Sequence, residues 1–262
     1  MADLITEAGI RALLSKELNS LVSIEILEST TSTNDYIKQA ALEDECRYKV
    51  VIAEEQTGGK GRRGKSFISP KGCGIYLSIK FSTQDVSASY AQQLTALSAV
   101  AVCRAIEEHT ANRADIKWPN DVYCIEKKVC GILCESQTEA YSGKLISAIA
   151  GIGIDVYKPE HDLSINQDIT YLAETETEGL RNRLTASLIE QFIILHIQGI
   201  VSAREEYLQR SMLLGQDIAI HYDDSRTVPA HVEDINENLQ LVVQYTDGKQ
   251  ETLDIGDFSI SF

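Results

Sequence analysis

The sequence predicts an α/β domain followed by a small β-barrel. Two observations predict the first part: short apolar runs with strand-like alternation recur along it, and segments with helical spacing lie between them. A third observation marks the second part, because near Gly215 the pattern changes to short alternating strands. We therefore assign residues 1–212 to the first domain and residues 213–262 to the second.

The first domain begins with a helical segment over residues 4–20 and a strand over residues 23–28. Ser32 follows, with Asp35 three residues later and apolar side chains at helical spacing beyond it. We interpret this pattern as a capping box in which Ser32 is the N-cap residue. A helix that begins there presents free backbone N–H groups and small hydroxyls, which suit a polar ligand.

The remaining elements alternate between strands and helices. Two runs form a hairpin with its turn near residues 124–127, and a later run contains two glycines, which often mark a close backbone approach. In the second domain Asp247-Gly248 is a hairpin turn signal. The predicted strands are 49–53, 74–81, 116–122, 128–135, 145–156, 218–220, 239–245 and 255–262, and the predicted helices are 89–109 and 179–210, the latter in two pieces around Gly199.

The composition is that of a globular protein and excludes several classes. With 24 Lys and Arg against 39 Asp and Glu, the net charge of -15 argues against general nucleic-acid binding. No segment approaches the roughly 20 apolar residues of a membrane span, and the N-terminus lacks the regions of a signal peptide, so we expect a cytoplasmic protein. The six cysteines form no C-x-x-C pair, which makes a zinc site unlikely and predicts reduced thiols.

A basic loop stands out in this acidic chain. Residues 59–65 read G-K-G-R-R-G-K, with four cations (Lys60, Arg62, Arg63 and Lys65) and no acid. The three glycines let the backbone bend and approach a ligand closely. Such a loop suits a phosphate or a carboxylate, although the same pattern also occurs in solvated surface loops.

A second polar constellation is Lys117-Trp118-Pro119-Asn120-Asp121, which contains the only tryptophan of the chain. Proline interrupts a strand ladder, so Asn120 and Asp121 are expected to turn toward a cleft. Asp121 offers the hard oxygen ligand that Mg²⁺ prefers, and Asn120 can read a base edge by hydrogen bonds. The alternative is a structural turn in which both side chains cap the backbone.

Together these motifs resemble a known family, the biotin–protein ligases, also called biotin–[acetyl-CoA-carboxylase] ligases. No single motif is specific, but five of them occur in the order of the family with compatible spacing. The matching segments are Ser32–Asn34, Glu54–Gly64, Lys117–Val122, Lys128–Leu133 and Gly151–Val156.

The resemblance implies a fold and an activity. The fold is α+β, with a mixed central sheet flanked by helices as in class II synthetase-like catalytic domains, and an SH3-like β-barrel at the C-terminus. The activity consumes ATP with Mg²⁺, forms biotinyl-5′-AMP, and transfers biotin to a lysine of a biotin carboxyl carrier domain. The family likeness also suggests a monomer or a weak homodimer.

The resemblance also implies roles for individual residues. Lys128 and Arg62 are expected to be catalytic, because the first step joins two anions and needs cations at the developing charge. Asp121 is the expected Mg²⁺ ligand. Biotin contacts fall on Ser32, Thr33, Asn34, Gln56, Lys60, Gly61, Arg62, Lys128 and Gly131, and ATP contacts on Arg62, Arg63, Phe67, Asn120 and Asp155.

Three of these positions depart from the pattern of the family. Lys60 stands where arginine is usual, which keeps the charge and loses the bidentate fork. Phe67 replaces a tryptophan and offers a smaller aromatic face. Asp155 replaces asparagine, and an ionised aspartate has no side-chain donor.

Three other functions remain open from the sequence. A lipoate–protein ligase shares the fold and the adenylation chemistry, although the basic loop, residues 117–121 and the C-terminal domain favour biotin. A biotin-sensing repressor needs an N-terminal winged helix-turn-helix, for which a first strand near residue 22 leaves no room, so we expect a monofunctional ligase without a nucleic-acid or membrane partner. A non-catalytic biotin-binding module is disfavoured by the presence of both Lys128 and Asp121.

Overall fold

A mixed seven-stranded sheet forms the centre of the first domain. The computed structural model describes residues 3–42, 46–83, 90–138, 145–160, 168–222, 225–254 and 258–261. The strands lie in the order β1–β2–β3–β7–β6–β5–β4, with β1 parallel to β2 and the other neighbours antiparallel. Their bounds are Val22–Leu27 (β1), Tyr48–Ala53 (β2), Gly74–Ser82 (β3), Asp115–Lys117 (β4), Asp121–Cys124 (β5), Lys127–Thr138 (β6) and Leu145–Asp155 (β7). The predicted mixed central sheet is confirmed.

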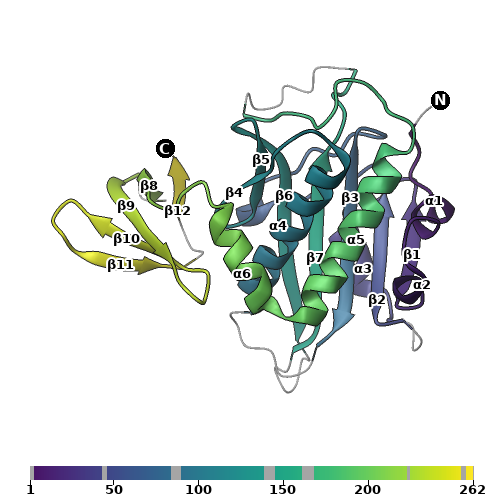
Figure 1. Ribbon diagram of the computed structural model, residues 1–262, viewed down its shortest axis with the longest axis horizontal. Coiled ribbons are helices and arrows are strands. Elements are labelled where there is room, and N and C mark those ends of the chain that lie inside the picture. The colour runs from purple at the N-terminus through teal and green to yellow at the C-terminus, as the bar shows by residue number, and fades with distance from the viewer. Residues whose placement is uncertain are drawn as a thin grey trace.

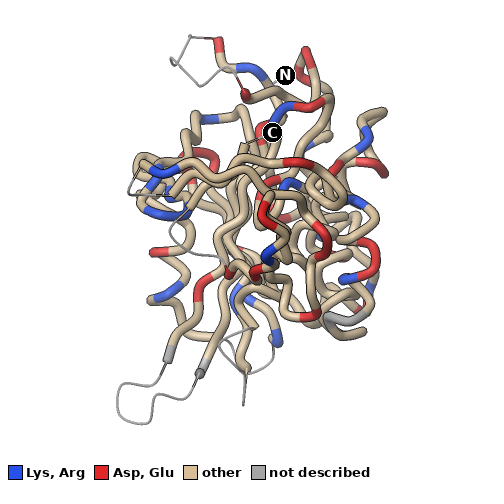
Figure 2. Tube along the Cα trace, turned by 90° about the vertical axis from the view of Figure 1, so that its left-hand side faces the viewer, with Lys and Arg blue, Asp and Glu red and all other residues tan. Residues whose placement is uncertain are grey.

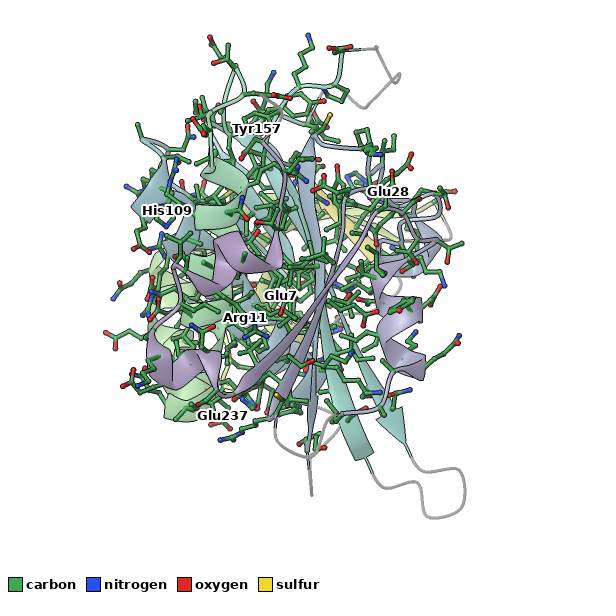
Figure 3. The ribbon with its side chains drawn as sticks, turned by 90° about the vertical axis from the view of Figure 1, so that its right-hand side faces the viewer. Glu7, Arg11, Glu28, His109, Tyr157 and Glu237 are labelled. Carbon is green, nitrogen blue, oxygen red and sulfur yellow. The ribbon has the colours of Figure 1, made fainter. Side chains whose placement is uncertain are left out.

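Helices cover both faces of this sheet. On one face α4 (Tyr90–His109) packs against α5 (Leu180–Gln198) and α6 (Ile200–Gln209), as Figure 1 shows. On the opposite face lies α3 (Thr33–Gln39), which packs on β2, β3 and β7 (Figure 3). The predicted break at Gly199 is confirmed, because this residue separates α5 from α6 with φ 86°.

The two faces of the sheet differ in how much apolar surface they bury. Alternate side chains of the central strands, such as Val50, Ile52 and Leu77, join the large core beneath α4 and α5. The face beneath α3 holds a small cluster of Ile37, Val51 and Ile149. Part of that face is polar or lacks side chains, which leaves it available for a site.

The N-terminal helical segment differs from its prediction in one respect. Residues 4–20 form two short helices, α1 (Glu7–Arg11) and α2 (Lys16–Asn19), instead of one. The hydroxyls of Thr6 and Ser15 each accept a hydrogen bond from a backbone N–H at a helix start, so each short helix has its own N-cap. The predicted start of the long helix at Ser89 lies outside the described residues, which resume at Tyr90.

The capping box predicted at Ser32 is wrong. Ser32 does occupy the N-cap position of α3, with extended backbone, but its hydroxyl makes no capping hydrogen bond. Gln56 satisfies the first turn instead, because its side-chain oxygen accepts from the backbone N–H of Thr33 at 2.9 Å. Asp35 forms an ion pair with Lys60 at 2.6 Å, so its carboxylate serves the basic loop.

The predicted strand over residues 116–122 is divided in two. β4 ends at Lys117 and β5 begins at Asp121, with a cis Trp118–Pro119 peptide between them. Proline cannot donate to a strand ladder, which explains the interruption. The predicted hairpin turn is confirmed, because Ile125 and Glu126 both have positive φ between β5 and β6.

The C-terminal domain is a five-stranded antiparallel sheet in the order β11–β10–β9–β8–β12. It lies beside α6 and β4, at the left of Figure 1. Trp118 fixes it to the first domain by donating from Nε1 to the carbonyl of Leu239 at 2.8 Å and by stacking on Phe258. The strands are Asp217–Tyr222 (β8), Thr227–Ile235 (β9), Leu241–Tyr245 (β10), Gln250–Leu253 (β11) and Phe258–Ser261 (β12).

A histidine links three elements at the end of the core. Nδ1 of His196, on α5, lies 2.7 Å from the hydroxyl of Tyr48, and Nε2 lies 2.8 Å from the hydroxyl of Tyr90. Its ring centroid is 4.3 Å from that of Phe81. Burial lowers the pKa of His196 to about 4, so the ring is neutral and donates through one nitrogen while it accepts through the other.

We expect this histidine to make the fold sensitive to acid. The pKa of His196 lies below its ordinary value of 6.5, so the unfolded chain binds the extra proton and stability falls as the pH drops from about 6.5 to 4. Between pH 7 and pH 5 the wild type should lose about 1 kcal/mol more unfolding free energy than His196→Gln, which keeps a donor and an acceptor. Urea denaturation of both proteins at the two pH values measures the difference, and equal losses would contradict it.

Candidate active site

One cavity of about 500 Å³ opens on the face of the sheet that carries α3. Segments distant in the sequence enclose it: the start of α3, the segment between β2 and β3, the turn between β4 and β5, and β12 of the C-terminal domain. We call the segment of residues 54–73, which connects β2 to β3, the lid loop. Every residue that the sequence singled out lines this cavity, namely Ser32, Thr33, Asn34, Gln56, Lys60, Gly61, Arg62, Arg63, Phe67, Asn120, Asp121, Lys128, Gly131 and Asp155.

The floor of the cavity is bare sheet. Strand register aligns Asp121, Gly131 and Gly153 in one row across β5, β6 and β7, while Leu133 and Gly151 align in the next row. A Cβ atom at Gly153 would lie closer than 3.0 Å to the ring of Phe67. The missing side chains therefore let the lid loop lie directly against the backbone.

The start of α3 is held by side chains of neighbouring segments. Gln56 accepts from both the N–H and the hydroxyl of Thr33, and it donates to the hydroxyl of Ser69 at 2.9 Å. Ser78, from β3, lies 2.8 Å from the hydroxyl of Thr33 and 2.6 Å from Oδ1 of Asn34. These contacts fix the polar end of α3 over the sheet.

Asn34 makes its contacts within the protein. Its amide nitrogen donates to the carbonyl of Leu133 at 3.1 Å and to the carboxylate of Glu135 at 2.8 Å. Its carbonyl lies against Gly151, where a Cβ atom would collide with it. Asn34 thus holds α3 against β6 and β7, and its predicted contact with a ligand stays a prediction.

The lid loop brings its cations to the cavity. Arg62 is half-buried and donates from Nη1 to Oδ1 of Asn120 at 3.2 Å, so the basic loop reaches the turn between β4 and β5. Burial lowers the pKa of its guanidinium, and the nearby Asp121 carboxylate opposes that effect. Lys60 lies at the other side, paired with Asp35. Arg63 has φ 57° in the short 3-10 turn Arg62–Gly64 and is exposed.

A lysine and an acid form the opposite wall. Lys128, at the start of β6, lies 2.7 Å from Oδ1 of Asp121. Asn120 donates to the same carboxylate oxygen at 3.2 Å and to the carbonyl of Ile132 at 3.0 Å. The cavity therefore holds Arg62 and Lys128 within one hydrogen-bond network, with a single carboxylate between them.

Asp155 lies at the end of β7, with Lys128 as its nearest charge. Burial raises the pKa of Asp155 to about 7, and Lys128 only partly offsets this. A carboxyl group with this pKa is protonated in half of the molecules near neutrality and then offers an O–H donor. The aspartate at this position can thus supply a donor that the ionised form lacks.

Residues 26–155, which carry most of this cavity, match the model of the Biotin/lipoate A/B protein ligase family. These residues are therefore similar to the domain that defines this family. All five motifs that suggested the resemblance begin within the matched residues.

Curated relatives belong to the same ligase family. The chain is 32% identical over 193 residues to the bifunctional ligase/repressor BirA of Bacillus subtilis, a match that covers 73% of this chain and 57% of BirA. It is 26% identical over 245 residues to the biotin–[acetyl-CoA-carboxylase] ligase of Mycobacterium tuberculosis, covering 89% and 87% of the two chains. The chain thus spans little more than half the length of the BirA relatives that it matches.

Solved structures of ligases share the fold. The biotin protein ligase of Aquifex aeolicus in complex with biotin and ATP superposes with a TM-score of 0.70 at 23% identity, over 91% of this chain and 98% of that one. The Leishmania major enzyme in complex with biotinyl-5-AMP gives 0.56 at 20% identity, over 88% and 98%. In the part of the chain that the structure describes, no helix combines the length and the apolar character that crossing a bilayer requires.

Several residues that line or support the cavity were missed by sequence reasoning. Ser69, Ser78 and Glu135 hold Gln56 and Asn34, and no local motif identifies them, because their importance arises only when α3 meets the sheet. Lys117 also lines the cavity, and burial lowers its pKa. The quoted segment K-W-P-N-D contained this lysine, so its position beside Asp121 in the register was the available signal.

We expect Asp155→Asn to stabilise the protein at alkaline pH. The pKa of Asp155 is raised to about 7 from 3.8, so the folded state binds more protons between these values and stability is lost as the pH rises through 7. Asparagine does not titrate, so the unfolding free energy of Asp155→Asn should exceed that of the wild type by about 4 kcal/mol at pH 8 and by almost nothing at pH 4. Urea denaturation checks this, and an advantage independent of pH would exclude titration as its cause.

Proposed function

We propose that this protein is an ATP-dependent biotin–protein ligase of the biotin–[acetyl-CoA-carboxylase] type. The observation that carries the proposal is the arrangement of one cavity: a cationic pair, Arg62 and Lys128, faces the polar start of α3 across a floor of glycines. Such a site accommodates a carboxylate and a phosphate together. The names of the relatives support biotin as the carboxylic acid.

The first step joins two anions. A carboxylate oxygen of biotin attacks the α-phosphorus of ATP, the bond to the β-phosphate oxygen breaks, and pyrophosphate leaves with the electron pair. Biotinyl-5′-AMP, a mixed anhydride, remains. Arg62 and Lys128 lower the barrier by stabilising negative charge on the phosphoryl oxygens in a site shielded from bulk water.

The second step requires an amine from outside the chain. The neutral ε-amine of an acceptor lysine attacks the anhydride carbonyl, an amide forms, and AMP leaves while the amine loses a proton. The protein needs no nucleophile of its own for either step. In agreement, the described residues that line the cavity include no histidine and no cysteine.

A Mg²⁺ ion fits the donor set at one end of the cavity. Asp121 is half-buried, and among the described residues no group of three or more His, Cys, Asp or Glu side chains forms a complete cage. A single carboxylate that shares the ion with substrate phosphates is the arrangement Mg²⁺ commonly adopts. Asp121 would hold the ion, whose chemistry is to neutralise phosphate charge.

The remaining assignments follow from the same proposal. The acceptor is a biotin carboxyl carrier domain of a biotin-dependent carboxylase, and the ligase works in the cytoplasm as a monomer or a weak homodimer. The net charge of -15 supports a function without nucleic acid. Figure 2 shows Lys and Arg (blue) and Asp and Glu (red) distributed over the whole trace.

The decisive experiment weighs the acceptor. The full chain is incubated with ATP, Mg²⁺ and a biotin carboxyl carrier domain, with biotin in one reaction and lipoate in a parallel one. We expect a mass gain of one biotinyl group on a single lysine in the biotin reaction only, measured by intact-protein mass spectrometry. A gain with lipoate alone identifies a lipoate ligase, and no gain in either reaction refutes the proposal.

The lid loop can be tested through its best-anchored cation. Arg62→Ala removes the hydrogen bond to Asn120, and we expect it to release at least about tenfold more free biotinyl-5′-AMP per transferred biotin, because an open lid exposes the intermediate to water. Liquid chromatography of the reaction mixture measures the ratio. Lys71→Ala is the matched control, since Lys71 lies in the same loop and only pairs with the exposed Glu28. Equal release by both variants would rule out the lid role.

A further inference from the structure

The lid loop leaves the sheet and returns to it at two adjacent points. β2 ends at Ala53 and β3 begins at Gly74, and these strands are antiparallel neighbours, with Ala53 opposite Tyr76. Glu54 is therefore the first residue of the loop, and Gly74 is the first residue beyond it. Contacts that hold Glu54 and Gly74 in place therefore hold both ends of the lid loop, which together form its base.

A single buried side chain contacts both ends. Arg181, at the start of α5, is 0% exposed. Its Nη1 donates to Oε2 of Glu54 at 2.9 Å, while Nε and Nη2 donate to the carbonyl of Gly74 at 2.9 and 2.6 Å. The planar fork of arginine has the donors and the width to connect two such acceptors at once.

The contacts of this arginine are reinforced from the N-terminal segment. Nη1 of Arg181 also donates to the carbonyl of Asp3 at 2.8 Å, and Oδ2 of Asp3 accepts from the backbone N–H of Arg181 at 2.9 Å. The other oxygen of Glu54 accepts from the N–H of Ile5 at 3.0 Å. Tyr157, labelled near the upper end of the sheet in Figure 3, donates to the same Asp3 carboxylate.

These contacts lie outside the cavity, on the side of the sheet opposite to α3. Arg181 belongs to α5, which packs on β3 from the face that α4 also covers, and it does not line the cavity. Gln56, only two residues after Glu54, does line the cavity and holds Thr33. A shift of Glu54 would move Gln56, and displacements of about 1 Å can cost two orders of magnitude in rate.

We propose that Arg181 is a positioning residue that clamps the base of the lid loop, so that the loop moves only between two fixed ends. The inference rests on the proposed function, because it assigns the clamp to the retention of the biotinyl-5′-AMP intermediate. The ion pair with Glu54 is buried, and removing one partner leaves the other uncompensated. A lysine at position 181 would keep the charge but has one ammonium group in place of the fork.

The test compares Arg181→Lys with Arg104→Lys in the full chain. Arg104 is the matched control, because its guanidinium also forks onto a carboxylate, that of Glu206 at 2.9 and 2.6 Å, but it connects α4 to α6. We expect Arg181→Lys to release at least about fivefold more free biotinyl-5′-AMP per transferred biotin than Arg104→Lys. Liquid chromatography measures this ratio at a temperature where both variants are fully folded by circular dichroism.

A second readout is independent of catalysis. The lid loop contains the trypsin sites Lys60, Arg62, Arg63, Lys65 and Lys71. Brief trypsin treatment followed by mass spectrometry should show cleavage within residues 54–73 at least about fivefold faster in Arg181→Lys than in Arg104→Lys. Equal cleavage rates in Arg181→Lys and Arg104→Lys overturn the proposed role of Arg181, whether or not biotinyl-5′-AMP forms. If the wild type forms no biotinyl-5′-AMP, that result contradicts the proposed function alone.

A milder variant keeps the proposal testable if Arg181→Lys does not fold. Glu54→Gln retains the shape of Glu54 and one of its two acceptor oxygens but removes its charge. It should raise tryptic cleavage of the lid loop and release of the intermediate in the same direction by about twofold or more. If Glu54→Gln and Arg104→Lys show the same cleavage rate of the lid loop and the same release of biotinyl-5′-AMP, the proposed role of Arg181 is overturned.

Discussion

The structure of this site depends on the absence of side chains from one strip of the central sheet. Gly151 lets Asn34 lie against β7, and Gly131 and Gly153 do the same for Phe67. The approach of α3 then brings Ser78 within hydrogen-bond distance of Thr33 and Asn34, so the helix is fixed by polar contacts rather than by a large apolar interface. A methyl group at Gly151 would collide with Asn34 of α3, and a methyl group at Gly153 would collide with Phe67 of the lid loop.

The charged side chains at the cavity form ion pairs between different segments. Two of the cations at the cavity are Lys60, on the lid loop, and Lys128, at the start of β6. Each forms an ion pair with a carboxylate of another segment: Lys60 with Asp35, and Lys128 with Asp121. These exposed or half-exposed pairs contribute little to stability. Their effect is to hold the ammonium groups of Lys60 and Lys128 at the cavity.

The structure brings the residues of the sequence motifs together at one cavity, whereas part of the local structure around them differs from the prediction. Motifs gathered every proposed site residue around one cavity, because each motif lies at a strand end or a helix start on the same edge. The capping box failed because Gln56, distant in the sequence, competes with Ser32 for the first turn of α3. Glu135 was not predictable, because its value arises from a tertiary contact with Asn34 that no local pattern encodes.

Two of the three residues that depart from the family pattern illustrate how the neighbouring structure determines the effect of a substitution. Lys60 needs to reach one carboxylate, that of Asp35, and an ammonium does this as a point charge without the fork of an arginine. Asp155 differs from asparagine in its charge and in its lack of an N–H donor, and burial raises its pKa so that it is partly protonated near neutral pH. In both cases the neighbouring structure determines which property of the side chain matters. A comparison of residue types alone would therefore overestimate the effect of either substitution on the site.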